Sequence, residues 1–402
     1  MITGIQKKMG IYVTDNIKFI GIDDASCRIF EAQYPTPLGM SYNSYVIVDE
    51  KIAVMDSVEE NGGDQWLTDI LAATEGRTPD YLVVHHMEPD HSACIARAMH
   101  HFPEMKIVTG VQAAKMLPQF FPDENFDGRV ITVREGDTLS LGTHELHFYS
   151  APMVHWPEVM VSYESNTRTL FSADAFGKFG ALQYADDWVG EARRYYLNIV
   201  GRYGQQVQAL LKKLVPVTID RIAPLHGPVL SAPLDRYLRL YDLWSRYQPE
   251  TRGVMIAYAS IYGGTAAAAL ELADMLRRAG IQVAVMDLTK CDMSEAVAQA
   301  FRLSHLVLAT PTYDSGIFPV MHDFIHHLSL KNFRNRIVGY IENGSWAPTA
   351  AKRMSALMAT MPDITELTAT VTIRSRLDEN SRRQLATLAD TLVTSLSEQE
   401  KH

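Results

Sequence analysis

The pattern of apolar and polar residues changes character at the polar segment 247–253, which contains both proline and glycine. In residues 10–60, short apolar runs rich in β-branched side chains alternate with turns. This pattern predicts antiparallel strands. After the polar segment, apolar strand-like runs alternate with helical stretches, as is typical of βαβ units in a parallel sheet. We therefore expect two domains, residues 1–250 and residues 251–402.

Composition limits the classes of protein that fit. The 402 residues are 47% hydrophobic and 21% charged, which is ordinary for a globular protein, and the net charge of −10 argues against phosphate binding along a nucleic acid. No stretch approaches about 18 uninterrupted apolar residues, and Met1–Lys8 lacks the apolar core of a signal peptide. The cysteines lie far apart and form no C-x-x-C pair. We expect a cytoplasmic protein that binds neither membrane nor nucleic acid.

A dense set of potential metal ligands follows a predicted buried strand that ends at His85. They are His86, Glu88, Asp90 and His91. In an extended segment, residues two apart point the same way, so the first three side chains can converge. Imidazoles and carboxylates packed this closely repel or desolvate one another without a cation. The alternative is a polar loop that contains histidines by chance. We interpret the loop as a metal site.

Three further candidate ligands follow later strand-like runs. His155 lies between two prolines just after one predicted strand, Asp174 follows the next, and His226 ends a third. Each position alone has a simple structural explanation; Asp174, for example, could cap a turn. Together with the first loop they form four strand-end positions, which supports a shared site with Asp174 as a bridging carboxylate.

The first loop, His-x-Glu-x-Asp-His, resembles the His-x-His-x-Asp-His motif of metallo-β-lactamase-like proteins, with a carboxylate at the second position. The hard, charged oxygen of Glu88 favours iron, whereas an imidazole there suits zinc hydrolysis. This pattern resembles that of the flavodiiron proteins, and the resemblance covers essentially the whole chain. It implies an α/β protein: an N-terminal metallo-β-lactamase-like αββα sandwich followed by a flavodoxin-like doubly wound parallel sheet.

The resemblance also implies a ligand set for two iron ions. One iron would be held by His86, Glu88, His155 and Asp174. The other would be held by Asp90, His91, His226 and the shared Asp174. Members of the family differ in whether the residue that matches His91 binds the metal.

Loops at the carboxyl ends of predicted parallel strands carry candidate cofactor residues in the second domain, where a doubly wound sheet binds its ligand. The first loop precedes a helix and offers amide groups and a positive helix end to a phosphate, although ordinary βα loops also use glycine. The candidates are Ser260, Ile261, Tyr262, Gly263, Gly264, Thr265, Pro311, Thr312, Tyr313, Asp314, Ser315, Gly316, Asn343, Gly344, Ser345 and Trp346. The resemblance to flavodoxin implies that they bind FMN, with Trp346 or Tyr313 stacking on the flavin unless it belongs to the core.

The leading hypothesis is a flavodiiron oxidoreductase that passes electrons from FMN to a non-haem di-iron site, which reduces dioxygen to water and/or nitric oxide to nitrous oxide. The alternatives are a zinc-dependent hydrolase with an attached flavodoxin domain and an electron carrier without enzymatic activity. The resemblance further implies rubredoxin, or a reduced deazaflavin, as the electron donor. It also implies a head-to-tail homodimer or a dimer of dimers.

Overall fold

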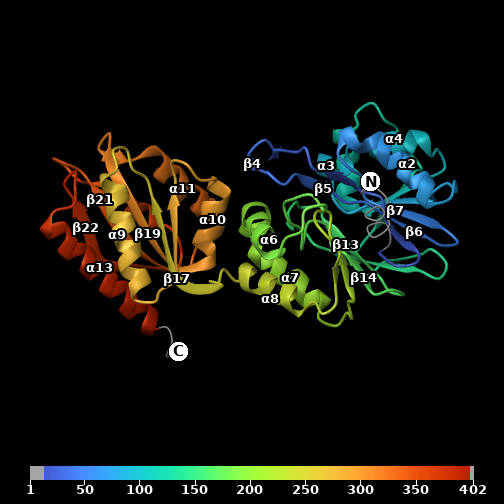
Figure 1. Ribbon diagram of the computed structural model, residues 1–402. Helices are drawn as coiled ribbons and strands as arrows, with labels where there is room; N and C mark the ends of the chain where they lie inside the picture. The colour runs from blue at the N-terminus through green and yellow to red at the C-terminus, as the bar shows by residue number, and fades with distance from the viewer. Residues whose placement is uncertain (1–12, 399–402) are drawn as a thin grey trace, which may run out of the picture. The chain divides into compact units, whose positions relative to one another are not determined.

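The computed structural model describes residues 13–398, which divide into two compact units (Figure 1). The first unit contains the residues up to Tyr196 together with Gln205–Tyr241; the second contains Leu197–Gly204 and the residues from Asp242 onward. The stretch Met1–Lys8 lies outside the described residues. Within residues 13–398, none of the helices has the length and apolar character needed to span a bilayer.

The first unit is built on mixed sheets. One sheet has the order β1-β6-β7-β8-β9-β10, with parallel pairing from β7 to β10. Its strands are β1 (Ile17–Phe19), β6 (Tyr45–Val48), β7 (Ile52–Met55), β8 (Tyr81–Val84), β9 (Lys106–Gly110) and β10 (Val130–Val133). Another has the order β11-β12-β13-β14-β15-β16, in which only β14 and β15 are parallel among the described strands. Its strands are β11 (Thr138–Ser140), β12 (Glu145–Ser150), β13 (Met160–Glu164), β14 (Thr169–Phe171), β15 (Arg221–Ala223) and β16 (Leu230–Ser231).

Apolar side chains from both sheets form one core. Ile47 and Val83 of the first sheet cluster with Leu146, Phe148 and Phe171 of the second, and all are almost completely buried. Helices cover the outer faces, with α2 and α4 on one side and α7 on the other (Figure 1). The helices are α2 (Gly63–Ala73), α3 (Pro89–Ser92), α4 (Ile95–His101), α5 (Val111–Phe120), α6 (Val189–Tyr195), α7 (Gly204–Leu214) and α8 (Asp235–Ser245). The αββα sandwich expected from the sequence is confirmed.

Short hairpin-like pairs complete the first unit. Strand β2 (Ile22–Asp24) pairs with β5 (Met40–Tyr42), and β3 (Ile29–Phe30) pairs with β4 (Tyr34–Pro35). The ring of Phe30 packs edge-on against His226, with 5.4 Å between ring centroids. The β3–β4 pair therefore lies beside one of the predicted metal ligands.

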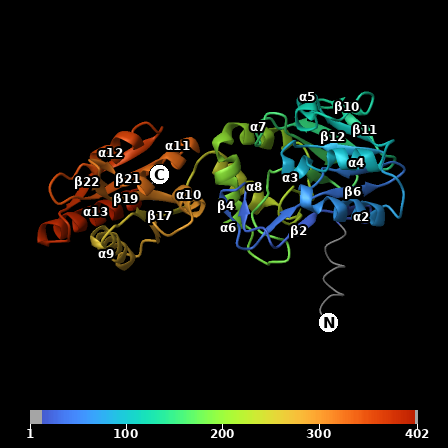
Figure 2. The ribbon, with the colours of Figure 1, turned by 90° about the horizontal axis from the view of Figure 1, so that it is seen from above.

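The second unit is a parallel sheet with the order β18-β17-β19-β21-β22. Its strands are β17 (Thr251–Tyr258), β18 (Val283–Asp287), β19 (Leu303–Tyr313), β21 (Arg336–Asn343) and β22 (Ile364–Ile373), and β20 (Gly316–Ile317) pairs with the end of β19. Figure 2 shows α11 and α12 on one side of the sheet and α9 and α13 on the other. The helices are α9 (Gly264–Arg278), α10 (Met293–Arg302), α11 (Pro319–Leu330), α12 (Ala350–Met358) and α13 (Glu379–Glu398). The doubly wound sheet is thus also confirmed.

A buried ion pair in the first unit lies outside the metal loops. His144 Nδ1 is 3.0 Å from Glu164 Oε1, and both side chains are almost fully buried. The Glu164 carboxylate raises the pKa of His144 against the effect of burial. Burial would raise the pKa of Glu164, but the contacts with His144 and Thr167 lower it. A histidine pKa that is raised by folding contributes stability below about pH 6.5, and that contribution is lost as the pH rises through the folded value.

We therefore expect Glu164→Gln to lower the free energy of unfolding by about 1.5–3 kcal/mol near pH 6 and by less near pH 9. The contribution of Glu164 to stability also has a lower pH limit. Because folding lowers the pKa of Glu164, this contribution is present above about pH 4.5 and is lost as the pH falls through the folded value. Urea denaturation at several pH values measures this. The control is Glu145→Gln, which removes a half-exposed pair with His147 and should have little effect. An equal loss of stability at both pH values would contradict the prediction.

Candidate metal centre and cofactor pocket

The predicted metal ligands all lie just beyond strand ends in the first unit. His86 comes two residues after β8, Asp174 three residues after β14, and His226 three residues after β15; His155 is in the loop between β12 and β13. Because these strand ends lie at one edge of the sandwich, the structure brings the side chains together.

The ligand atoms fall into two groups among the described residues. His86, Glu88 and His155 form the first, and Asp90, His91 and His226 form the second. In the first group, Glu88 Oε2 lies 3.2 Å from His86 Nε2 and 3.0 Å from His155 Nε2. In the second, Asp90 Oδ2 lies 3.2 Å from His226 Nε2 and 3.3 Å from His91 Nε2.

Asp174 lies between the two groups and presents one oxygen to each. Its Oδ2 atom is 3.3 Å from His86 Nε2 and 3.7 Å from His155 Nε2. Its Oδ1 atom is 3.6 Å from His226 Nε2 and 3.8 Å from His91 Nε2. A carboxylate in this position can bridge two cations.

The buried polar atoms of this centre fit a cation. Both oxygens of Asp90, one of Asp174 and Nε2 of His155 are buried without a hydrogen-bond partner in the described part of the chain. Burial and the neighbouring His226 hold the pKa of His91 well below its usual range, and burial raises the pKa of Asp90 despite its contact with His226. Both shifts disfavour the charged forms, and buried groups of this kind are normally paired or bound to a metal. Imidazole and carboxylate are suitable donors for divalent iron.

Hydrogen bonds with groups outside the two ligand sets orient the ligands. His86 Nδ1 lies 2.8 Å from Glu158 Oε1, and His226 Nδ1 lies 2.6 Å from the carbonyl oxygen of Ser41. The hydroxyl of Tyr195, at the end of α6, donates to Asp174 Oδ1 at 2.9 Å. The sequence alone does not reveal the roles of Glu158 and Ser41. The position of Glu158, three residues after His155, is the one local signal.

His85, although adjacent to the metal loop, faces away from both groups. Its Nδ1 atom contacts Asp56, and its Nε2 atom lies 2.8 Å from the hydroxyl of Ser162. All three side chains are buried. His85 is therefore structural.

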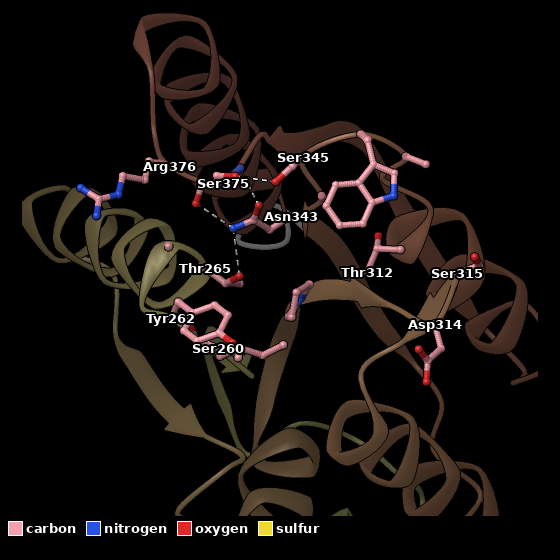
Figure 3. Close-up of a pocket in the computed structure, with 16 residues that line it drawn as sticks. Ser260, Tyr262, Thr265, Thr312, Asp314, Ser315, Asn343, Ser345, Ser375 and Arg376 are labelled. Atoms are coloured by element: carbon pink, nitrogen blue, oxygen red, sulfur yellow. Dashed lines mark hydrogen bonds between the residues drawn. The ribbon is translucent and has the colours of Figure 1, made fainter.

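A cavity of about 470 Å³ lies at the carboxyl ends of the parallel strands in the second unit (Figure 3). The predicted loops supply most of its lining: Ser260, Ile261, Tyr262, Gly264, Thr265, Pro311, Thr312, Asp314, Ser315, Asn343, Gly344, Ser345 and Trp346. Three predicted residues, Gly263, Tyr313 and Gly316, are not in the lining. Gly263 instead forms the turn before α9 with a φ of +85°, which glycine adopts without strain.

A fourth loop, between β22 and α13, also reaches the cavity and is not predicted from the sequence. It contributes Ser375 and Arg376. Figure 3 shows Ser375, Asn343 and Thr265 meeting on one side of the cavity. Asn343 Nδ2 donates to the carbonyl of Ser375 at 3.2 Å and contacts the hydroxyl of Thr265 at 3.4 Å. A Cβ atom on Gly264 would lie 2.1 Å from the Ser375 carbonyl, so only glycine allows this approach.

Comparisons with known proteins define the class. Residues 40–227 match the model of the ODP family beta lactamase, and residues 256–359 match that of flavodoxin. The chain is thus a fusion of a β-lactamase-like metal-centre unit and a flavodoxin unit.

Relatives of the same organisation identify the family. The chain is 27% identical to the rubredoxin-oxygen oxidoreductase of Megalodesulfovibrio gigas, covering 96% of this chain and 97% of the relative. It is 28% identical to the nitric oxide reductase of Moorella thermoacetica, covering 81% and 84%. The solved rubredoxin oxygen:oxidoreductase from Desulfovibrio gigas superposes with a TM-score of 0.89 at 26% identity, covering 96% and 98% of the two chains. The chain belongs to the flavodiiron protein family.

We expect a divalent cation to stabilise the metal-depleted protein, because it compensates the buried carboxylates. At a free Zn²⁺ or Fe²⁺ concentration of about 100 Kd, the gain is about 2.7 kcal/mol and appears as a higher Tm. Asp90→Asn should reduce this gain. Asp123→Asn, an exposed carboxylate of the same unit, should not. A wild-type Tm that does not respond to either cation would refute the expectation.

Proposed function

We propose that this protein passes electrons from FMN to a non-haem di-iron site and reduces dioxygen to water and/or nitric oxide to nitrous oxide. The observation that carries this proposal is the position of Asp174, with one oxygen facing each ligand group. Family membership and the flavodoxin unit support it. When bound, the two irons and the flavin would supply the electrons and the open coordination positions.

The side chains of the first unit would hold and orient the two irons. His86, Glu88 and His155 would bind one ion, Asp90, His91 and His226 the other, and Asp174 both. The carbonyl of Ser41 accepts from His226 Nδ1, so Nε2 keeps its lone pair for the metal. The Tyr195 hydroxyl keeps the Asp174 carboxylate in its bridging orientation.

The side chains of the second unit would bind FMN. The phosphate fits at the start of α9, where backbone N–H groups and the Thr265 hydroxyl are available. The hydroxyl of Ser260 accepts from the amides of Gly263 and Ala266 at 3.1 and 3.2 Å and so fixes this turn. The indole of Trp346 is 90% exposed and offers a free aromatic face to the flavin ring.

The names of the relatives support a particular electron donor for this chain, but they do not indicate which gas it prefers as substrate. The rubredoxin-oxygen oxidoreductase supports rubredoxin as the donor of this chain, with a reduced deazaflavin as the other candidate. Relatives named for dioxygen and for nitric oxide have similar identity, 27% and 28%. Steady-state rates for both gases, with reduced rubredoxin as donor, would decide the preference.

We expect Asp174→Ala to abolish iron binding while the flavin spectrum is unchanged, because each unit has its own core.

Trp346→Ala should leave iron unchanged and weaken FMN binding by about 0.5–1.5 kcal/mol, roughly 2- to 10-fold. Metal analysis after anaerobic purification and flavin titration measure both effects. Wild-type protein with two zinc ions and no iron would instead favour the zinc hydrolase.

We also propose that the working unit is a head-to-tail homodimer or a dimer of dimers, in which the flavin of one chain serves the irons of the other. Besides the family resemblance, the aromatic rings beside the flavin pocket support this proposal. Tyr262 is 97% and Trp346 90% exposed, and exposed aromatic side chains of this kind are enriched at interfaces.

Complementation tests this assembly. Gly264→Val should prevent flavin binding through its clash with Ser375, and Asp174→Ala should prevent iron binding. After subunit exchange, a mixture of the two inactive variants should recover up to about one quarter of wild-type activity, since half of the chains enter heterodimers and each heterodimer has one intact site. The control is each variant mixed with itself. No recovery despite verified exchange would mean that electrons pass within one chain.

A further inference from the structure

The ligand histidines differ in the hydrogen-bond partner of the ring nitrogen that faces away from the metal centre. His86 Nδ1 meets a carboxylate, that of Glu158, at 2.8 Å. His226 Nδ1 meets a neutral carbonyl, that of Ser41, at 2.6 Å. His91 Nδ1 is buried and has no hydrogen-bond partner among the described residues. The hydrogen bonds that orient the ligand histidines therefore differ between the two groups.

Glu158 is itself held firmly. Its side chain is fully buried, and Oε1 accepts a second hydrogen bond, from the backbone N–H of Met87, at 2.9 Å. It belongs to the loop that also carries His155 and Trp156, and the Trp156 ring packs edge-on against His86 with 5.1 Å between centroids. One carboxylate thus joins the loops that supply the first ligand group.

The charge of Glu158 is only partly compensated. Oε1 accepts from the Met87 N–H and contacts His86 Nδ1, and both contacts favour the carboxylate form of the side chain. Its other oxygen, Oε2, is buried without a hydrogen-bond partner in the described chain. A buried anion behind a ligand imidazole makes that imidazole a stronger donor and favours a higher positive charge on the metal. A neutral carbonyl has a weaker effect of the same kind.

We propose that Glu158 is a positioning residue that makes the two metal positions unequal: through His86, it strengthens cation binding at the position formed by His86, Glu88 and His155 and favours the more oxidised state of an ion there. This inference rests on the proposed di-metal site. The competing explanation is that Glu158 only joins two loops.

The His144–Glu164 pair provides a matched control. It is also a buried histidine–glutamate pair with a short contact, 3.0 Å, and it contributes to the same unit. Neither residue belongs to a ligand group. Glu158→Gln and Glu164→Gln both replace a buried carboxylate by a neutral amide of nearly the same shape, so a general loss of stability affects both variants.

Co²⁺ titration of the metal-depleted, full-length protein separates the two explanations. We expect wild type to bind two equivalents and Glu158→Gln to bind one of them about 10- to 100-fold more weakly. Glu164→Gln should keep wild-type affinity for both, although its Tm falls. Unchanged affinities in Glu158→Gln, or an equal loss in Glu164→Gln, would overturn the inference. A wild type that binds fewer than two equivalents would instead refute the di-metal site itself.

Redox titration of the iron-loaded protein gives a readout that loop joining would not change. Removing the charge in Glu158→Gln should raise the reduction potential of one iron, and Glu164→Gln should leave both potentials unchanged. Glu158→Asp keeps the negative charge and should lie between wild type and Glu158→Gln. If the glutamine variant does not fold, the aspartate variant carries the test: one metal position should bind more weakly than in Glu164→Gln, and affinities and potentials equal to those of Glu164→Gln would overturn the inference. Equal shifts in the aspartate and glutamine variants would show that the charge is not the cause.

Discussion

The two ligand groups bury carboxylate and imidazole atoms that have no hydrogen-bond partner in the described chain, and the need to compensate them with a cation constrains the loops of the first unit. Asp174 is placed between two ligand groups by a backbone with left-handed conformations at Ala173 and Phe176, with φ values of 50° and 66°. Such conformations cost about 1–3 kcal/mol each in non-glycine residues. Met153, just before His155, has a φ of 64°. Part of the costly backbone of the chain therefore lies beside the ligands, and a bound cation would offset the cost of that part.

The second unit applies the same geometric rule to a different chemistry. Parallel strands end together, so their following loops share one edge of the sheet. In the first unit these loops carry charged ligands, whereas the cavity of the second is lined mainly by hydroxyl, amide and glycine residues. Ser260 uses its hydroxyl to fix the turn before α9, and Gly264 leaves space for the Ser375 carbonyl. Backbone amides at a helix start can then receive an anion, and Arg376 of the fourth loop adds a cation to the lining.

Local sequence patterns predicted the antiparallel strands, the βαβ alternation and the strand-end positions of the candidate ligands, because these features depend on residues close together in the sequence. The resemblance to a known family then implied the two folds. Local patterns did not predict the contacts that join distant loops. Ser375 meets Asn343 across 32 residues, and Glu158 meets His86 across 72. Likewise, nothing in Leu197–Gly204 signals that this segment packs with the second unit, where the Tyr247 hydroxyl accepts from the amide of Gly204 at 3.0 Å. Such partners depend on tertiary packing, which a single sequence does not display.

Negative charge is distributed unequally between the two ligand groups of the metal centre. The first ligand group combines Glu88 with the buried carboxylate of Glu158 behind His86. The second has Asp90 in contact with two histidines, one of them supported only by a neutral carbonyl. Among buried side chains, such a difference in charge is screened less than it would be in water. The shared Asp174 adds to the difference, because Tyr195 donates to Oδ1, which faces the second group, whereas Oδ2 has no hydrogen-bond partner in the described chain. The asymmetry must therefore come from the residues behind the ligands, which the ligand motif alone does not reveal.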